Sequence, residues 1–423
     1  MKKKHSVGRF TLIVILCAIF AVLTIFSFSL PGSSKDYDFV GFARAINLGV
    51  EYRGGTVETY SVNLNTQTNL NLQDGISSNV TRIEYLLDDE GYNTNVYQNG
   101  NNIVVEFFDE YSPVGIEDII NAKTYFAIKT TESDTAEEVV KAEDILDAYA
   151  TTSGSQNVLV INFTTSGATN FAKVIENGTG YFYVGTNSPF SLSLTNANSS
   201  YVGIVMKSLD TAKSYASQIL AAKYDMSFEK LSTTEYSKAD ANKNVIVLIC
   251  LVLALFVLAV ALLVCLYKHL GLVGGLILTI GLLLQILLLQ AVPETAFTFT
   301  GPALFASLLS FALGVLSLLI MFKNMHNEYK QGKILYASVK IGYTKIWTRI
   351  LDMFVVFMIP AIIAYFFGSY LVKQFAMALI CGLAVYGFTT LILTKFFTKW
   401  LTYIKFKNAD YGFKRGTNVN ELK

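Results

Sequence analysis

Six apolar stretches, separated by one long polar interval, constrain this chain of 423 residues more than any other feature. A helix needs about 20 apolar residues to cross a hydrocarbon core roughly 30 Å thick, because no water there can bond to the backbone. The stretches that reach this length are Phe10–Pro31, Val245–Tyr267, Leu270–Val292, Thr300–Phe322, Ile350–Val372 and Phe375–Phe396. They predict an α-helical polytopic membrane protein: one helix over 10–31, a folded domain over 32–244 and a five-helix membrane domain over 245–396.

Basic and acidic residues are unevenly distributed among the segments between these helices. The tail over 1–9, the turn at Lys268, the loop Lys323–Arg349 and the tail from Lys395 hold 18 Lys and Arg but three acidic residues. The interval 32–243 holds 14 Lys and Arg against 27 Asp and Glu, a net charge of −13. Because basic segments stay in the cytoplasm, we expect both tails, 1–9 and 397–423, to be cytoplasmic and the large domain and the turn near Glu294 to be extracytoplasmic.

The first apolar stretch, which follows three lysines, has an alternative interpretation as a cleaved signal peptide. Its apolar run is longer than the roughly 7–15 residues of a signal-peptide core, and Phe28–Pro31 lacks the small residues of a cleavage site. A retained membrane helix is therefore favoured.

The polar interval predicts two subdomains, a base and a head. Alternation over Val57–Val62 indicates a strand, and the base, about 45–112 and 200–235, is predicted to be ferredoxin-like. Its other expected elements are a helix at 72–91, strands at Asn93–Tyr97, Asn102–Phe108 and Tyr201–Met206, a helix at 209–223 and a strand at Met226–Lys230. The head, about 113–199, is expected to contain a helix at 136–149, a strand at Asn157–Phe163, a helix at 165–177 and a strand at Gly180–Val184.

An acidic cluster in the expected helix 136–149 allows two interpretations. Its members are Glu137, Glu138, Glu143, Asp144 and Asp147. They could be paired carboxylates for acid–base chemistry, but a solvated face of an amphipathic helix has the same pattern and is favoured.

Residue types that catalysis requires are scarce in the polar interval. The only histidines of the sequence, His5, His269 and His326, lie on the predicted cytoplasmic side, so no imidazole is available to activate a nucleophile there. The sequence has no Walker-type nucleotide-binding run. All four cysteines fall in predicted membrane helices (Cys17, Cys250, Cys265 and Cys381), which argues against a disulfide framework or zinc site in the domain. We expect no enzyme activity, no catalytic residue, no metal and no cofactor.

Ion-driven transporters usually keep charged residues within their helices, whereas these helix interiors hold few polar residues. The exceptions are Thr279, Gln285, Gln290 and, near the start of the fifth helix, Asp352. Packing or interfacial roles are favoured for each over a place in an ion pathway.

One motif lies between the first helix and the first strand: Gly49, Glu51, Arg53, Gly54, Gly55 and Thr56 belong to the run GVEYRGGT. By itself it is also consistent with a tight turn, because glycine tolerates positive φ. In this context it resembles the signature of the bacterial SecD and SecF proteins. The resemblance to SecD continues almost without gaps from Thr298, through Tyr329–Lys333, Gly342–Trp347, Ile350–Asp352, Phe366–Ser369, Val372–Ala376 and Thr389–Lys395. Asn157–Phe163 and Gly167–Ala172 resemble a strand and helix of the family's head.

Membership of this family implies an RND-type fold of six helices and an external domain whose head can swing. It also implies partners: a SecF-like membrane protein, the Sec translocon channel, an unfolded preprotein and membrane lipid, with no nucleic acid. In the family, the external domain is thought to hold the emerging preprotein while proton flow through the helices resets it. The implied location is a bacterial cell membrane.

The chain departs from the family pattern where helices four and five would couple to protons. The resemblance places Leu316 and Leu318 where the family has an acidic residue and an asparagine; Asp352 and Gly368 keep the expected spacing in the fifth helix. The pair Lys323-Asn324 replaces a Glu-Arg pair, and Ala222–Ser227 replaces an Arg-x-Gly-Ala-Leu-Pro run. The resemblance therefore implies a divergent member, with proton-coupling residues supplied by a partner.

The leading hypothesis is an accessory subunit of preprotein translocation that captures the emerging chain in late stages of export. The alternative is an RND-like exporter of lipids or small molecules, because fold alone does not determine cargo. A membrane-anchored binding module without a transport role is disfavoured, since it would not need five further helices.

Overall fold

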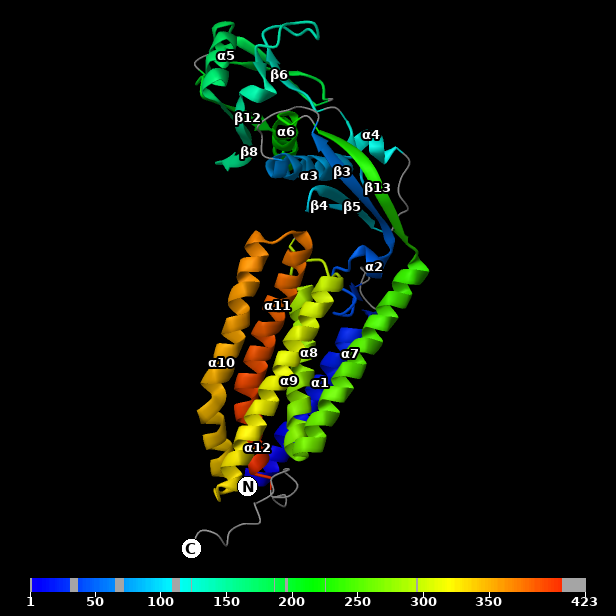
Figure 1. The fold of residues 1–423 in the computed structure, drawn as a ribbon, viewed down its shortest axis with the longest axis vertical. Helices are drawn as coiled ribbons and strands as arrows, with labels where there is room; N and C mark the ends of the chain where they lie inside the picture. The colour runs from blue at the N-terminus through cyan, green and yellow to red at the C-terminus, as the bar shows by residue number, and fades with distance from the viewer. Residues whose placement is uncertain are drawn as a thin grey trace. The chain divides into compact units, whose positions relative to one another are not determined.

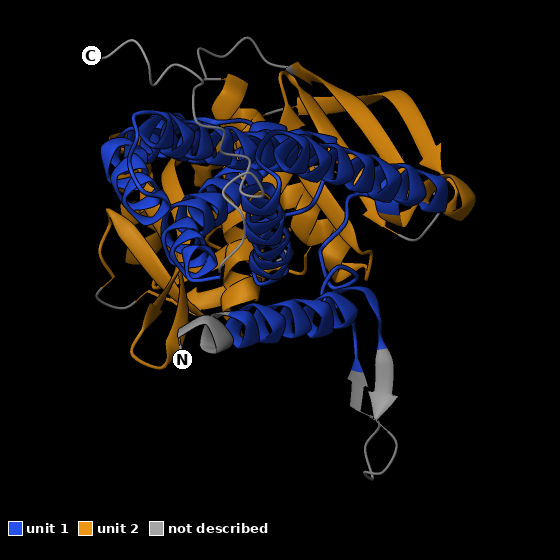
Figure 2. Cartoon of the chain, turned by 90° about the horizontal axis from the view of Figure 1, so that it is seen from below, with its two compact units in different colours: residues 1–52, 242–423 blue, residues 53–241 orange. Residues whose placement is uncertain are grey.

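The computed structural model describes residues 2–30, 37–64, 72–108, 115–122, 124–185, 187–194, 197–224, 226–293 and 296–404. The chain divides into two compact units (Figure 2). Met1–Tyr52 and Asn242–Lys423 form what we call the membrane unit, and Arg53–Ala241 form the α+β unit. Part of the predicted basic tail, residues 405–423, and the turn residue Glu294 lie outside the described residues.

Six helices of the described part of the membrane unit are long and apolar enough to cross a membrane (Figure 1), as predicted. Their sequences are apolar on all sides, as helices surrounded by lipid and by other helices require. They are α1 (Lys2–Ile25), α7 (Lys238–Tyr267), α8 (His269–Gln290), α9 (Gly301–Lys330), α10 (Leu335–Phe367) and α11 (Tyr370–Phe388), the last continued by the π-helix η2 (Thr389–Leu393) and α12 (Thr394–Thr402). Short strands β1 (Phe28–Leu30) and β2 (Tyr37–Phe39) pair after α1.

Close approach of α8, α9 and α11 builds the centre of this unit. The ring of Tyr386 on α11 is fully buried against Gly281 of α8 and Gly314 of α9. A Cβ atom at either glycine would lie 2.7 to 2.9 Å from that ring. Glycine is therefore required at both positions for this packing.

The segment Lys323–Arg349, expected as a loop, is largely helical, which corrects that expectation. Helix α9 runs to Lys330 and α10 begins at Leu335. The buried carboxylate of Glu328 accepts hydrogen bonds from Lys333 and, at 2.6 Å, from Lys345, so it joins both helices. These ion pairs neutralise part of the charge that made the segment resemble a loop in the sequence.

The base of the α+β unit is an antiparallel sheet in the order β13-β3-β5-β4. Its elements follow one another as strand, helix, two strands, helix and strand, with the head inserted after β5. They are β3 (Gly55–Leu64), α3 (Leu72–Asp89), β4 (Thr94–Asn99), β5 (Asn102–Phe108), α6 (Leu209–Ala222) and β13 (Met226–Tyr236). Alternating apolar residues of β3 and β5 pack with α3 and the short helix α4 (Ile116–Ile120) into one core. The ferredoxin-like name for this base stays a prediction.

The head contains two separate antiparallel sheets around one core that also includes residues of α6. The first sheet has the order β11-β10-β6-β7 and the second β12-β9-β8. Their strands are β6 (Phe126–Lys129), β7 (Val140–Lys141), β8 (Ile145–Ser153), β9 (Gln156–Phe163), β10 (Thr179–Val184), β11 (Phe190–Ser193) and β12 (Tyr201–Met206), with helix α5 (Thr165–Glu176) beside them.

Two expectations for this unit are wrong. The segment 136–149 is not a helix: it forms β7, a 3-10 turn (η1, Ala142–Asp144) and the start of β8, because pairing of β8 with β9 outweighs its amphipathic acidic pattern. Tyr201–Met206 is a strand, but it pairs with β9 in the head and not with the base sheet. Its buried residues Val202 and Ile204 belong to the head core.

Candidate functional site: the junction motif Gly49 to Thr56

The motif Gly49–Thr56 lies where the chain passes from the membrane unit into the α+β unit. It begins beside the start of α9: Phe299 N–H donates to the Asn47 carbonyl at 2.6 Å, and Gly49 N–H donates to the Phe299 carbonyl at 3.0 Å. These bonds form a short parallel bridge of Leu48 with Phe299. The motif then continues as a single helical turn, α2 (Val50–Arg53), and as β3.

Glu51 ties this turn to two membrane helices. Its Oε1 accepts a hydrogen bond at 2.6 Å from the N–H of Gly301, the first residue of α9. Its carbonyl accepts a second bond at 2.9 Å from Asn244 Nδ2 on α7. The first N–H groups of a helix have no partner within the helix, and the helix dipole favours a negative charge beside them. Glu51 therefore caps α9 from a segment 250 residues earlier in the chain.

The residue that would normally cap α9 does not do so. Thr300 occupies the N-cap position without a side-chain capping bond, and among the described residues its buried hydroxyl has no partner. A Cβ on Gly49 would lie 3.2 Å from both Thr300 Cγ2 and Glu51 Oε2. Glycine at this position thus leaves room for the carboxylate to reach the helix end.

The second half of the motif belongs to the α+β unit. Gly54 and Gly55 have φ angles of +96° and +135°, a backbone region that residues with a side chain rarely adopt. The guanidinium of Arg53 lies 5.3 Å from the centre of the Phe108 ring on β5, and Thr56 is fully buried in β3. The motif combines a helix cap on one side with a glycine-dependent turn into a strand on the other.

Nothing in this arrangement resembles a reaction centre. No histidine lies within the motif, and no cluster of three or more metal-binding side chains occurs anywhere in the described ranges. The motif supplies a cap for α9 and, further along the chain, the glycine turn that leads into β3.

The residues predicted for coupling in α9 and α10 differ in their exposure. Leu316 is 44% exposed, whereas Leu318, two residues later, is fully buried in the membrane unit. Asp352 on α10 is exposed. Gly368 ends α10, where a Cβ would lie 2.4 Å from the Ala364 carbonyl oxygen. Gly368 therefore has a packing requirement, while Leu316 faces outward from this chain.

Sequence reasoning missed a polar contact in the middle of the membrane unit. The sequence favoured a packing or interfacial role for Gln285 of α8. In the structure its side chain is 3% exposed, and its Nε2 donates a hydrogen bond to Ser310 Oγ of α9 at 3.4 Å. Gly382 of α11 leaves space for this pair, since its Cβ would lie 2.0 Å from Ser310 Oγ. The signal was present as helical spacing of small polar residues, for example Ser310 and Ser317 on one face of α9.

Comparison with known proteins agrees with this architecture, although no family model matches the chain. The protein translocase subunit SecD of Sebaldella termitidis is 24% identical over 396 residues, covering 88% of this chain and 94% of that protein. SecD of Elusimicrobium minutum is 34% identical over 123 residues, and SecD of Acidaminococcus fermentans is 32% identical over 130 residues. The chain matches only 26% and 30% of the lengths of these two relatives.

Solved SecDF structures share the fold over 95% of the chain. A super-membrane-facing form of SecDF has a TM-score of 0.63 at 17% identity, and SecDF from Thermus thermophilus has a TM-score of 0.52 at 15% identity. The chain resembles the SecD family over most of its length, at modest identity. It covers 58% and 59% of those two SecDF chains. The likeness confirms the predicted fold class, six membrane-length helices with a β-rich domain, and the SecD relatives do not favour the exporter alternative.

Proposed function

We propose that this SecD-family chain is an accessory subunit of the Sec preprotein translocase, and that its α+β unit holds the emerging polypeptide in late stages of export. The observation that carries the proposal is the match over 88% of the chain to a protein named as a translocase subunit. Holding a chain requires surface and movement, and not catalytic groups, which agrees with a junction built from a helix cap and a glycine turn.

The junction motif could transmit movements of the membrane helices to the α+β unit. Because Glu51 is bonded to the N-terminus of α9 and to α7, a displacement of either helix would be passed to α2 and along the chain to β3. Gly54 and Gly55 allow the direction of the chain to change between α2 and β3. The α+β unit would then follow movements that begin in the membrane.

A SecF-like membrane protein is the partner that we propose for the membrane unit. On α9, otherwise one of the most enclosed helices, a stripe of apolar side chains is exposed: Phe305 at 69%, Leu309 at 37% and Leu316 at 44%. A partner helix packed on this stripe would bring its own ionisable residue opposite Leu316, where this chain has none. Lipid would cover α1 and α7, whose apolar windows are only 6% buried.

The location that follows is the cell membrane of a bacterium, with both termini in the cytoplasm and the α+β unit outside. The charge asymmetry of the sequence, 18 basic against three acidic residues in the segments assigned to the cytoplasm, supports this orientation. The Sec channel and an unfolded preprotein would be met on the outer side.

Purification of the chain from gently solubilised membranes, followed by mass spectrometry, tests the proposal. We expect a SecF-like chain and the translocon channel to co-purify. Recovery of efflux components without either of them would contradict it. An Ala replacement of Leu316 in the exposed stripe of α9 serves as the matched variant, and it should reduce recovery of the SecF-like chain but leave the amount of this chain unchanged.

A further inference from the structure

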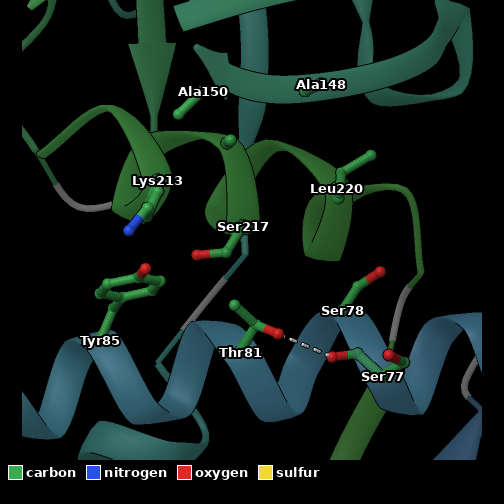
Figure 3. A pocket seen from close by; sticks show the side chains of 10 residues that line it. Ser77, Ser78, Thr81, Tyr85, Ala148, Ala150, Lys213, Ser217 and Leu220 are labelled. Atoms are coloured by element: carbon green, nitrogen blue, oxygen red, sulfur yellow. Dashed lines mark hydrogen bonds between the residues drawn. The ribbon is translucent and has the colours of Figure 1, made fainter. Parts of the chain in front are cut away.

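A cavity of about 350 Å³, open to solvent, lies on the α+β unit and is lined by elements of its base and head. Figure 3 shows α3 along one side, α6 along the other, and Ala148 and Ala150 of β8 above them. This volume is at the lower end of the range for ligand sites. We call it the α3–α6 cavity.

The walls of this cavity offer hydrogen-bonding oxygens and little bulk. Ser78, Thr81 and Ser217 donate their hydroxyl protons to carbonyls of their own helices at 2.8 to 3.2 Å, so lone pairs of the oxygens remain available to the cavity. The phenol of Tyr85 and the amine of Lys213, which line it at one end, can donate. An extended main chain needs acceptors for its N–H groups and donors for its C=O groups, whatever its side chains, and the lining of this cavity provides both.

The dimensions also suit a short extended segment. Ser77 and Tyr85, at opposite ends of the lining part of α3, are separated by about 12 Å along the helix axis at 1.5 Å per residue. An extended chain rises roughly 3.3 Å per residue. The α3–α6 cavity would therefore take about four residues with small side chains, next to a roof of two alanines.

The strand above the cavity is the edge of its sheet. In the order β12-β9-β8, no described strand follows β8. The N–H of Ala148, which lines the cavity, donates to the carboxylate of its neighbour Asp147 at 2.9 Å, a side-chain partner that an incoming carbonyl could replace. Main-chain groups at such an edge can pair with an added segment.

The charge around the cavity selects among possible occupants. Lys213 is the single charged residue of its lining, whereas the interval 32–243 has a net charge of −13. A small anion would be repelled by this field, and the lining has no second cation to hold one. A neutral segment with basic flanking residues is attracted instead.

We propose that the α3–α6 cavity binds an extended segment of the exported polypeptide, with small side chains in the cavity and basic residues beside it. This inference rests on the proposed role in export and names the part of the α+β unit that would bind the exported polypeptide. The cavity would recognise the main chain of that polypeptide, so binding would tolerate many sequences.

Reversible blocking of the cavity tests the inference in the full-length chain. Ala150→Cys places a thiol in the lining, and Thr151→Cys places one on the exposed, opposite face of the same strand. None of the four native cysteines lies in the α+β unit. After treatment of spheroplasts with a bulky, membrane-impermeant methanethiosulfonate, export of a secretory reporter should slow several-fold with Ala150→Cys, recover after addition of reductant, and stay unchanged with Thr151→Cys. Recovery by reductant excludes misfolding as the cause.

A photocrosslinking experiment identifies the occupant directly. We expect p-benzoylphenylalanine in place of Tyr85 to crosslink an arrested secretory chain several-fold more than the same residue in place of Tyr149, which is 44% exposed on the far face of β8. The cavity assignment would be wrong if thiol modification affected export equally in Ala150→Cys and Thr151→Cys, and if crosslinking from positions 85 and 149 were equal. The proposed function would still stand if deletion of the gene slowed export. If deletion left export unchanged, the proposed function itself would fail.

Discussion

Glu51 accepts a hydrogen bond at 2.6 Å from the backbone N–H of Gly301 and so caps a membrane helix from the segment that enters the α+β unit. The contact joins two positions separated by 250 residues. It gives the motif around Glu51 a structural role that the glycines alone would not explain: the turn α2, which precedes β3 in the chain, is bonded to the first residue of α9.

Replacing Glu51 should weaken the hydrogen bond to Gly301, and more strongly when both the acceptor and the charge are removed. Glu51→Ala removes the acceptor and the charge and should lower the free energy of unfolding by about 1–2 kcal/mol, whereas Glu51→Gln keeps an acceptor and should cost about half of that. Thermal unfolding of the purified chain in detergent measures both. Glu176→Ala, an exposed acid at the end of α5, is the control and should change nothing; equal effects of all three variants would refute the capping role.

Asparagine at Leu316 and at Leu318 should have opposite outcomes. Leu316→Asn changes an exposed side chain and should leave the amount of this chain as in the parent, but, like Leu316→Ala, it should reduce recovery of the SecF-like chain. Leu318→Asn buries an amide in an apolar core and should cost at least about 2 kcal/mol, seen as lower abundance and a lower unfolding temperature. Full recovery of the SecF-like chain with Leu316→Asn would contradict the proposed partner interface on α9.

Loss of the buried Asp144 should destabilise the head more than loss of the exposed Glu143 in the same acidic cluster. Its buried carboxylate accepts bonds from Lys141 N–H at 3.1 Å, Ser166 Oγ at 3.3 Å and Asn170 Nδ2 at 3.1 Å. Asp144→Ala leaves these donors without their partner and should cost about 1–3 kcal/mol. Glu143→Ala, in the same cluster but exposed, should cost less than about 0.5 kcal/mol. Limited proteolysis of the head distinguishes the two variants, and equal protease sensitivity would contradict the assignment.

Alkaline pH should weaken the base through Tyr60. Burial, and then the hydrogen bond to the buried Glu58 carboxylate, raise the pKa of the Tyr60 phenol well above its ordinary value of 10. Because the folded-state pKa is the higher one, the contribution of Tyr60 to stability is complete below pH 10 and is lost as the pH rises above it. Chemical denaturation between pH 8 and pH 11 should show a steeper loss for the parent chain than for Tyr60→Phe; identical slopes would contradict this account.

Local patterns predict the elements whose formation depends on their own sequence. The apolar length of each membrane helix and the alternation that forms β3 and β5 are of this kind, and Asn102–Phe108 agrees in both bounds with the structure. The segment 136–149 was predicted wrongly because its strand forms only when β9 lies beside it. In the junction motif, a tight turn at Gly54 and Gly55 could be expected from composition, but the Glu51 contact with Gly301 depends on tertiary structure and has no local signal.

The rate of precursor maturation in a pulse-chase experiment tests the central claim, a role in protein export, most directly. In cells that lack this chain, we predict that a secretory precursor is processed several-fold more slowly, and that the parent gene restores the rate. Processing at the parental rate in the deletion strain, with the chain absent by immunoblot, would contradict the account.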